Sequence, residues 1–154
     1  MTHSTEATAV GERRAQSHQA IDRLVSHRTQ MLALYSELAV HRPFEKSSTV
    51  VELLKRFCQS LVDYSADAHF RLYRYVDNDQ ERRMSVSKVA KEVYPYIERS
   101  TQKILDFNDR YDSDEHCEDS VGKLENDLSV LGEILADRIE LEDRLIDVLG
   151  KTRS

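Results

Sequence analysis

Apolar and polar residues alternate with a helical period along most of the chain. Within residues 49–76, Leu54 and Leu61 lie on an apolar arc, while Asp63 and Asp67 lie on the opposite, polar arc. Stripes in the other segments are also spaced three and four residues apart, as the seams of a helix bundle require. Helices are predicted over about residues 15–40, 49–76, 95–110 and 120–149, with a short helix over residues 85–93.

Local signals set the expected ends of these helices. Thr49 and Glu52 form the pattern of a capping box, and Pro95 suits the first turn of a helix. The acidic stretch before the last helix is expected to form a loop, and residues 1–14, which show no periodicity, a disordered N-terminal tail. The predicted fold is therefore all-α. It is a single-domain, antiparallel four-helix bundle over residues 15–150, with one short extra helix before Pro95.

Charged residues interrupt the apolar seams of two predicted helices. Arg138 and Glu142 stand one turn apart at the centre of the last helix's stripe, and Arg28 stands at the centre of the first. The first stripe is predicted to comprise Ile21, Val25, Arg28, Leu32, Tyr35 and Ala39. A buried charge without a partner costs several kcal/mol, so Arg28, Arg138 and Glu142 are expected to form one hydrogen-bonded network.

This interior network admits two interpretations. It is either a structural device that fixes helix register and order, or a polar cavity, open at one end, into which a partner's side chain reaches. Position along the seam does not choose between them. His69 and Tyr73 are expected to belong to the same interior, with His69 partly buried and hydrogen-bonded near Tyr73 one turn on.

The composition limits the classes of function. The chain has 154 residues, enough for one domain with a real core, and a net charge of −6, which disfavours non-specific binding to nucleic acid. The N-terminus carries no apolar signal-peptide core, and the sequence has no run long enough to span a membrane. With two cysteines and no sign of secretion, a cytoplasmic protein with reduced thiols is expected.

The sequence lacks the patterns that would indicate an enzyme or a metal site. No histidine follows a glutamate by three residues and no two histidines are four apart, which argues against di-iron and zinc-protease helices. The two cysteines lack the spacing of a metal site. No catalytic residue, metal or cofactor is therefore predicted. His69 leaves histidine phosphotransfer open as an alternative, although Phe-Arg-Leu-Tyr follows it instead of the lysine and glycine of phosphorelay modules.

A partner is expected to cover part of the second predicted helix. If the helix continues unbroken, Phe70 falls on the polar arc beside Asp63. An aromatic ring among carboxylates on a solvated face usually marks a binding surface. The candidate contact surface therefore includes Asp63, Asp67 and Phe70.

The stretch from Phe57 to Val76 also carries a family resemblance. Its FCQSLVDY, followed by AHF and LY, resembles the signature of the Rsd/AlgQ regulators of the primary sigma factor, which are bacterial anti-sigma proteins. The resemblance covers most of residues 16–150 in the right order. Three further stretches agree: Ile21-Asp22-Arg23 with Arg28 and Tyr35, Tyr94-Pro95 with Thr101-Gln102, and Ala136 to Ile146.

The resemblance implies a function without a chemical step. Proteins similar to this one bind the C-terminal helix-turn-helix region of the primary sigma factor and hold it away from core polymerase and the −35 promoter element as growth slows. The partner-binding set, in an expected one-to-one complex, comprises Asp22, Arg23, Asp63, Asp67, Phe70 and Arg71. The alternative is a histidine phosphotransfer or other helical adaptor module in a regulatory pathway.

Overall fold

Helices account for the secondary structure throughout the described part of the chain, as the sequence predicts. A computed structural model describes the backbone of residues 2–73 and 84–151, and the side chains of residues 19–69, Tyr73 and residues 86–149. In chain order the elements are α1 (Thr2–Ala39), α2 (Ser48–Asp67), the π-helix η1 (Ala68–Tyr73), α3 (Met84–Tyr111), α4 (Asp114–Ser120), the 3₁₀ turn η3 (Val121–Lys123) and α5 (Leu124–Lys151).

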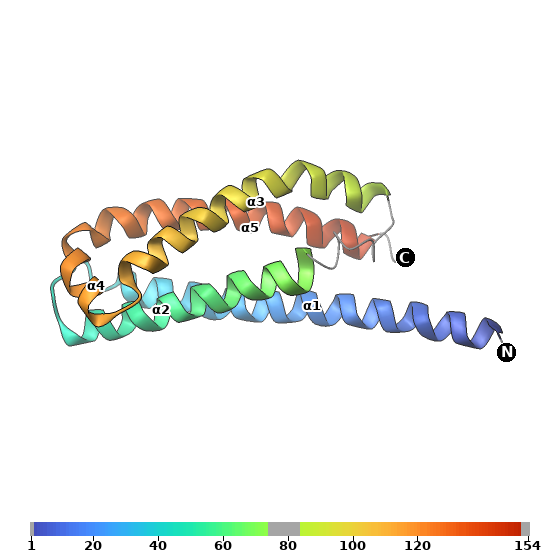
Figure 1. The fold of residues 1–154 in the computed structure, drawn as a ribbon, viewed down its shortest axis with the longest axis horizontal. Coiled ribbons are helices and arrows are strands. Elements are labelled where there is room, and N and C mark those ends of the chain that lie inside the picture. Colours follow the sequence, from blue (N-terminus) through green and yellow to red (C-terminus); the bar gives the residue numbers. More distant parts are fainter. Residues whose placement is uncertain (1, 74–83, 152–154) are drawn as a thin grey trace.

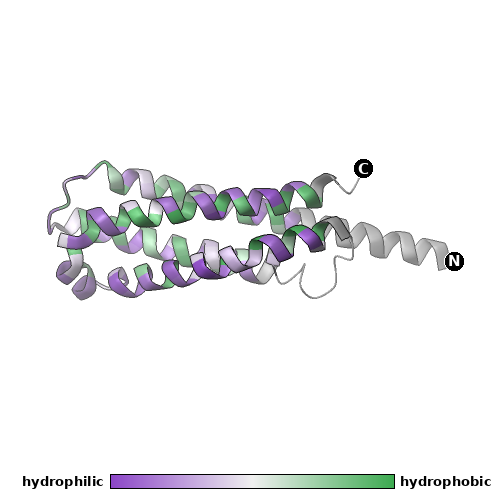
Figure 2. Cartoon of the chain, turned by 90° about the horizontal axis from the view of Figure 1, so that it is seen from above, coloured by the Kyte–Doolittle hydropathy of each residue, from purple (hydrophilic) through white to green (hydrophobic). Residues whose placement is uncertain are grey.

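The four long helices run up and down in two antiparallel pairs (Figure 1). α1 packs along α2, α3 packs along α5, and α4 lies at the end of the bundle where the chain turns from α3 into α5. Hydrophobic and hydrophilic residues alternate along each of these helices (Figure 2). The prediction of an all-α helix bundle is confirmed. Among the described helices, none combines the length and the apolar character that a membrane span would need.

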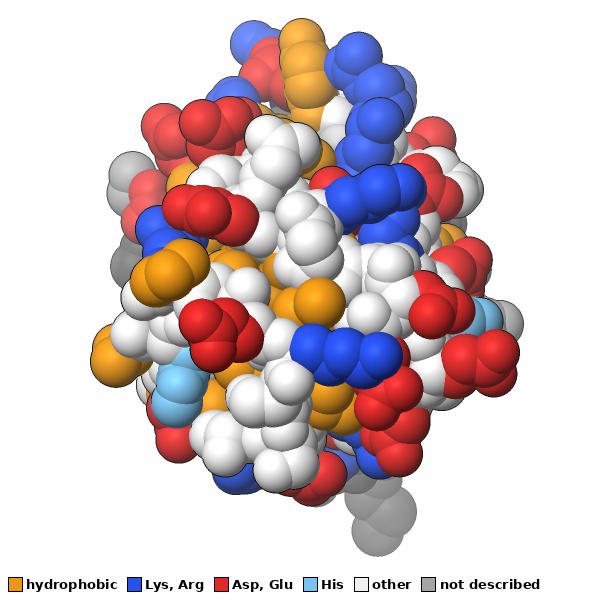
Figure 3. All heavy atoms as spheres, turned by 90° about the vertical axis from the view of Figure 1, so that its left-hand side faces the viewer, with side chains coloured by type: hydrophobic (Ala, Val, Ile, Leu, Met, Phe, Trp, Pro, Cys, Tyr) orange, Lys and Arg blue, Asp and Glu red, His pale blue; other side chains and the backbone are white. Residues whose placement is uncertain are grey.

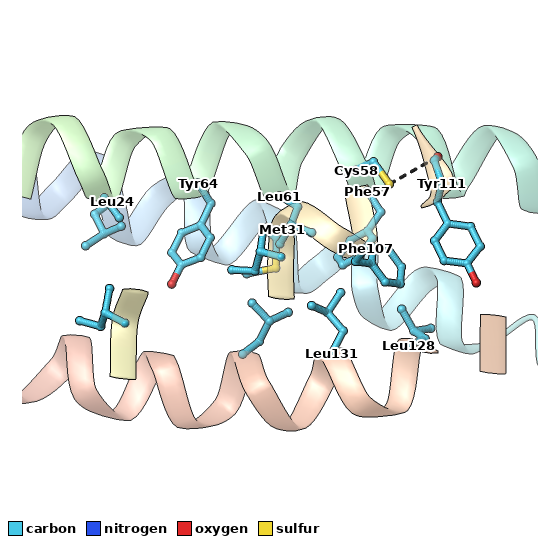
Figure 4. Close-up of a cluster of buried hydrophobic side chains, with 14 of the residues drawn as sticks. Leu24, Met31, Phe57, Cys58, Leu61, Tyr64, Phe107, Tyr111, Leu128 and Leu131 are labelled. Carbon is cyan, nitrogen blue, oxygen red and sulfur yellow. Dashed lines mark hydrogen bonds between the residues drawn. The ribbon is translucent and has the colours of Figure 1, made fainter. Parts of the chain in front are cut away.

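The core is a set of seams in which buried residues repeat at intervals of four and three. Burial of this apolar surface is the main force that holds the helices together. On α3 the buried seam comprises Val86, Ala90, Val93, Ile97, Ser100, Ile104, Phe107 and Tyr111. On α5 it comprises Leu124, Leu128, Leu131, Leu135, Arg138, Glu142, Leu145 and Leu149. Figure 4 shows the part of this core in which Phe57 and Leu61 of α2 point toward Leu128 and Leu131 of α5.

Pro95 lies inside a helix, so the predicted short helix before it is wrong. α3 runs without interruption from Met84 to Tyr111. Proline removes one backbone donor and disfavours a helical residue before it. Here Val93 and Ile97 continue the same buried seam on either side of Pro95. Burial of that seam outweighs the local cost of the proline.

The first helix faces the core one residue away from its predicted stripe. Its buried residues are Ala20, Leu24, Met31 and Leu38. Val25 and Leu32, which were predicted to be core, are each 38% exposed. The segment is rich in apolar residues on two adjacent arcs, and only the position of α2 decides which of them is covered. Arg28 and Tyr35 are therefore half-buried at the edge of the seam.

Two helix starts differ from the sequence prediction. The cap of α2 is Ser47, whose hydroxyl accepts a hydrogen bond from the backbone N–H of Val50 at 3.2 Å, so the Thr49–Glu52 capping box is wrong. The acidic stretch that was expected to be a loop contains α4, capped by Ser113.

The backbone of residues 2–14 continues α1 beyond the other helices (Figure 1). A disordered tail with a domain boundary at residue 14 stays a prediction.

Candidate functional site

Two helices bring several of the predicted partner-binding residues to one surface. Asp63 of α2 is exposed, and its Oδ1 accepts a hydrogen bond from Gln59 Nε2 at 3.0 Å. His27 of α1 places its Nδ1 3.5 Å from the backbone carbonyl oxygen of Asp63. Asp22 and Arg23, one turn earlier on α1, are also exposed. We call the surface formed by Arg23, Asp63 and Asp67 the α1–α2 face. Among the described residues no hydrogen bond or ion pair joins Asp22 to α2, so its part in this surface stays a prediction.

Asp67 lies deeper in this face than its helical phase suggests. It is only 6% exposed, although it stands one turn after the exposed Asp63. Arg23 Nε lies 3.7 Å from Asp67 Oδ1, and the arginine side chain is 54% exposed. The prediction that Asp67 is a solvated surface carboxylate is therefore wrong. α1 covers it, because η1 and the end of α2 pack against α1.

Phe70 and Arg71 belong to η1, but their side chains lie outside the described part of the structure. Their assignment to the partner surface stays a prediction. η1 itself was not predicted, because the sequence pattern alone does not distinguish a π-helical turn from an α-helix. The turn changes the helical phase after Asp67.

A buried polar cluster lies on the seam shared by α2, α3 and α5. Arg138 is 1% exposed, and its Nε donates to the Tyr64 hydroxyl at 3.1 Å and to Glu142 Oε1 at 3.2 Å. Its Nη1 donates to Ser100 Oγ at 3.0 Å and to Thr101 Oγ1 at 2.7 Å. A further contact of 3.4 Å joins Nη1 to the backbone carbonyl of Ile97. One guanidinium thus ties α5 to both α2 and α3.

Glu142 and the tyrosines of this cluster are strongly affected by burial. Burial raises the pKa of Glu142 to about 8, although the nearby charge of Arg28 acts in the opposite direction. The Tyr64 hydroxyl donates to Glu142 Oε1, while Glu142 Oε2 has no hydrogen-bond partner among the described residues. Burial also raises the pKa of Tyr73 to about 12 and lowers that of Arg138. The cluster therefore strongly favours neutral groups around its single guanidinium.

Arg28 does not join the hydrogen bonds of Arg138 and Glu142, contrary to the prediction of one network. Its Nη1 pairs with Asp143 Oδ1 at 2.9 Å, and the Arg28 side chain is 14% exposed. Because α1 is rotated relative to the predicted stripe, Arg28 reaches the rim of the bundle. There it affects Glu142 only through its charge.

His69 is exposed, whereas it was predicted to be partly buried. It lines a hollow of about 210 Å³ between η1 and α3, together with Tyr73, Tyr94 and Thr101. Tyr94 donates its hydroxyl to the backbone carbonyl of Tyr73 at 3.2 Å, and the two rings meet edge to face. Thr101 also accepts from Arg138, so this hollow reaches the polar cluster.

Comparison with known proteins decides which family the chain represents. The family model described as "Regulator of RNA polymerase sigma(70) subunit, Rsd/AlgQ" matches residues 3–150. This chain belongs to the Rsd/AlgQ family. The family resemblance predicted from the sequence is confirmed, and anti-sigma regulation is supported over the phosphotransfer alternative.

Individual relatives agree with the Rsd/AlgQ assignment. A "Regulator of sigma D" from Enterobacter sp. (strain 638) is 35% identical over 137 residues, which cover 88% of this chain and 82% of the relative. Proteins of the same name from Yersinia enterocolitica and Yersinia pseudotuberculosis are 33% and 32% identical over 133 residues. These alignments cover 84% of this chain and 80% or 79% of the relatives. No solved structure matches the chain.

Sequence reasoning missed most of the partners of Arg138 in this Rsd/AlgQ chain. Neither Tyr64 nor Thr101 was assigned to Arg138 from the sequence. Ser100 was not singled out, although its position on the four-and-three seam of α3 was a signal that could have found it. Within the described residues, no group of three or more histidine, cysteine, aspartate or glutamate side chains could hold a metal ion.

Proposed function

We propose that this protein sequesters the primary sigma factor by binding its C-terminal helix-turn-helix region in a one-to-one complex. Occupation of that region would keep sigma from core polymerase and from the −35 promoter element. Membership of a family that regulates the sigma(70) subunit carries this proposal. The action is stoichiometric binding without a chemical step, and its place is the cytoplasm.

The α1–α2 face has the chemistry that such a partner would need. A helix-turn-helix that reads DNA is basic, and complementary charge speeds encounter and selects the partner. Asp63 offers an exposed carboxylate that a single intrahelical hydrogen bond from Gln59 holds in place, so it keeps free acceptor capacity for an arginine. The chain as a whole carries a net charge of −6.

The end of the bundle that carries α4 is a weaker candidate, although it is rich in carboxylates. Figure 3 shows acidic and basic side chains interspersed on this end. Lys55 pairs with Asp114 at 2.9 Å, and Lys46 lies 3.9 Å from Glu118. His116 Nδ1 lies 2.8 Å from Asp112. These contacts offset much of the local negative charge, so the end offers a less coherent surface to a basic partner.

The first test is calorimetric titration of the full chain with the isolated C-terminal domain of its primary sigma factor at two salt concentrations. We expect one-to-one binding that weakens with salt, because the interface is charged. Asp63→Ala should weaken binding by at least about 2 kcal/mol, the loss typical of a central anchor. Unchanged affinity would remove Asp63 from the interface, and no binding by the unmodified chain would overturn the proposed function.

The chain offers a matched control for that variant. Asp106 on α3 is exposed and accepts from Gln102 Nε2 at 3.0 Å, the same intrahelical pair that Gln59 and Asp63 form on α2. Asp106→Ala removes the same charge and the same bond on another helix. It should leave the affinity for sigma unchanged, and an equal loss in both variants would indicate an effect of net charge alone.

A competition experiment separates sequestration from simple adaptor binding. Core polymerase is added to the complex of this protein with full-length sigma, and the fraction of sigma that remains bound is measured. We expect core polymerase and this protein to exclude each other. Formation of a stable ternary complex would support an adaptor and would contradict sequestration.

A further inference from the structure

A second hollow lies between α3 and α5, and the buried Arg138 is among the residues that line it. Its volume is about 280 Å³, near the lower end of the range of small-molecule sites, so it suits a small ligand. Six of the residues that line it matter for its chemistry: Tyr96, Arg99, Ser100 and Lys103 from α3, and Asp137 and Arg138 from α5.

Two of these residues are cations without a carboxylate partner. Arg99 and Lys103 are exposed and stand one turn apart on the same face of α3. Arg99 Nε donates to the backbone carbonyl of Pro95 at 3.4 Å, and its guanidinium stacks 4.6 Å from the centre of the Tyr96 ring. Neither Arg99 nor Lys103 forms an ion pair with a described residue. Their charges therefore remain available to a ligand.

The third cation is the buried Arg138. Four of the oxygen atoms to which it donates are neutral: the Tyr64 and Thr101 hydroxyls, the Ser100 hydroxyl and the backbone carbonyl of Ile97. Its fifth acceptor, the Glu142 carboxyl, has a pKa that burial raises to about 8, so at neutral pH it supplies little negative charge. A cation in such surroundings attracts an anion more strongly than a solvated one does.

We propose that this hollow binds the phosphate group of a small molecule. Three cations from two helices line it, against a single carboxylate, Asp137, among the lining residues. A phosphate presents several anionic oxygens at different angles and can engage arginine, lysine and hydroxyl groups together, whereas a carboxylate has only two oxygens. The site is distinct from the α1–α2 face, and the proposal does not depend on sigma binding.

The test is titration of the ¹⁵N-labelled full chain with pyrophosphate, followed by NMR at constant ionic strength. Saturable shifts are expected at the backbone amides of Ser100 and Lys103 and at the Nε–H of Arg138. Acetate, titrated in the same way, should give no saturable shift. Absence of saturation with pyrophosphate would overturn the site, and equal binding of acetate would overturn the assignment to phosphate.

Variants at the rim locate the ligand without disturbing the buried cluster. Arg99→Met and Lys103→Met should each weaken pyrophosphate binding about tenfold, the loss expected for one charge-assisted hydrogen bond. Lys91→Met is the matched control, because Lys91 is also exposed on α3 but does not line the hollow. An equal loss with Lys91→Met would show that only the overall charge matters and would contradict the proposal.

Asp137 provides a test of opposite sign. It is exposed and lines the hollow as a like charge to the ligand, so Asp137→Asn should tighten pyrophosphate binding several-fold. Unchanged or weaker binding would contradict a phosphate in this position.

Comparison of pyrophosphate with ADP then shows the source of the phosphate. Tighter ADP binding with shifts of the Tyr96 ring indicates a nucleotide, and equal affinity indicates that the phosphate group alone is recognised.

Discussion

The core contains two neighbouring layers that occupy equivalent positions one heptad apart but differ in chemistry. The apolar layer consists of Phe57, Phe107, Leu131 and Leu135, and the polar layer consists of Tyr64, Ser100, Arg138 and Glu142. In the apolar layer the Phe57 and Phe107 rings meet edge to face at 5.9 Å. In the polar layer Arg138 takes the place of Leu131 and bonds to all three other members.

The difference between the layers concerns specificity more than stability. An apolar layer gains from any close contact, so it tolerates small shifts of one helix along another. The polar layer stabilises one arrangement, because a slip of one heptad would press Arg138 against Phe57 and Phe107 without hydrogen-bond partners. The unbonded Glu142 Oε2 shows that this selection has a cost in stability. We therefore infer that the polar layer fixes the register of α2, α3 and α5.

The largest effect is expected when Arg138 alone is removed. Arg138→Met should lower the free energy of unfolding by about 4 kcal/mol, because it leaves buried oxygens without their donor. The measurement is urea denaturation followed by circular dichroism. The double variant Arg138→Met/Glu142→Leu should recover part of that loss, since it makes the polar layer apolar. A double variant that is less stable than Arg138→Met would contradict this account.

The corresponding truncation in the apolar layer should lower the free energy of unfolding by less than Arg138→Met does. A second substitution that introduces a polar group should not restore the loss. Leu131 is 2% exposed at the seam position one heptad before Arg138. Leu131→Ala removes buried methyl groups and leaves a cavity, with an expected loss of about 3 kcal/mol. The same urea titration measures it. A loss below about 1 kcal/mol would mean that this layer collapses around the gap, which a well-packed core does not do.

Substitution of Gly132, which lies beside the apolar layer, should have the next largest effect on the stability of the fold. The Tyr35 hydroxyl donates to the backbone carbonyl of Leu128 at 2.8 Å, and a Cβ on Gly132 would overlap that hydroxyl. Gly132→Ala should therefore destabilise the fold by about 2 kcal/mol, although alanine normally favours a helix by about 1 kcal/mol. Thermal unfolding measures the effect. Tyr35→Phe combined with Gly132→Ala should restore part of the lost stability, because it removes the overlapping hydroxyl. An unchanged loss would contradict the overlap as the cause.

The remaining prediction concerns pH, because the polar layer holds a buried carboxyl group at Glu142 and the apolar layer holds none. The pKa of Glu142 in the folded state, about 8, lies above the ordinary value of 4.5, so the folded protein holds a proton that unfolding releases. This contribution to the free energy of unfolding is complete below the ordinary pKa and is lost as pH rises toward 8. Glu142→Gln should flatten the fall in stability between pH 5 and 8. Parallel curves for the two proteins would contradict a neutral Glu142.

Periodicity within a helix determined the main features that could be predicted from the sequence. The all-α bundle, the seam of α5 and the central position of Arg138 and Glu142 on it follow from intervals of three and four residues. The family resemblance was visible for a related reason, because its central motif is a continuous stretch of sequence that begins on α2 and continues into η1. These features are local, so they need no knowledge of the neighbouring helices.

The tertiary structure alone decided which arc of α1 is covered, that α3 continues through Pro95, and that Asp67 is buried beneath Arg23. Each depends on a helix that is distant in the sequence. The choice of Tyr64, Ser100 and Thr101 as partners of Arg138 has the same origin, because their hydroxyls come from α2 and α3 while the guanidinium comes from α5. Single-helix periodicity shows that a residue faces the core, but only packing determines which atoms it meets there.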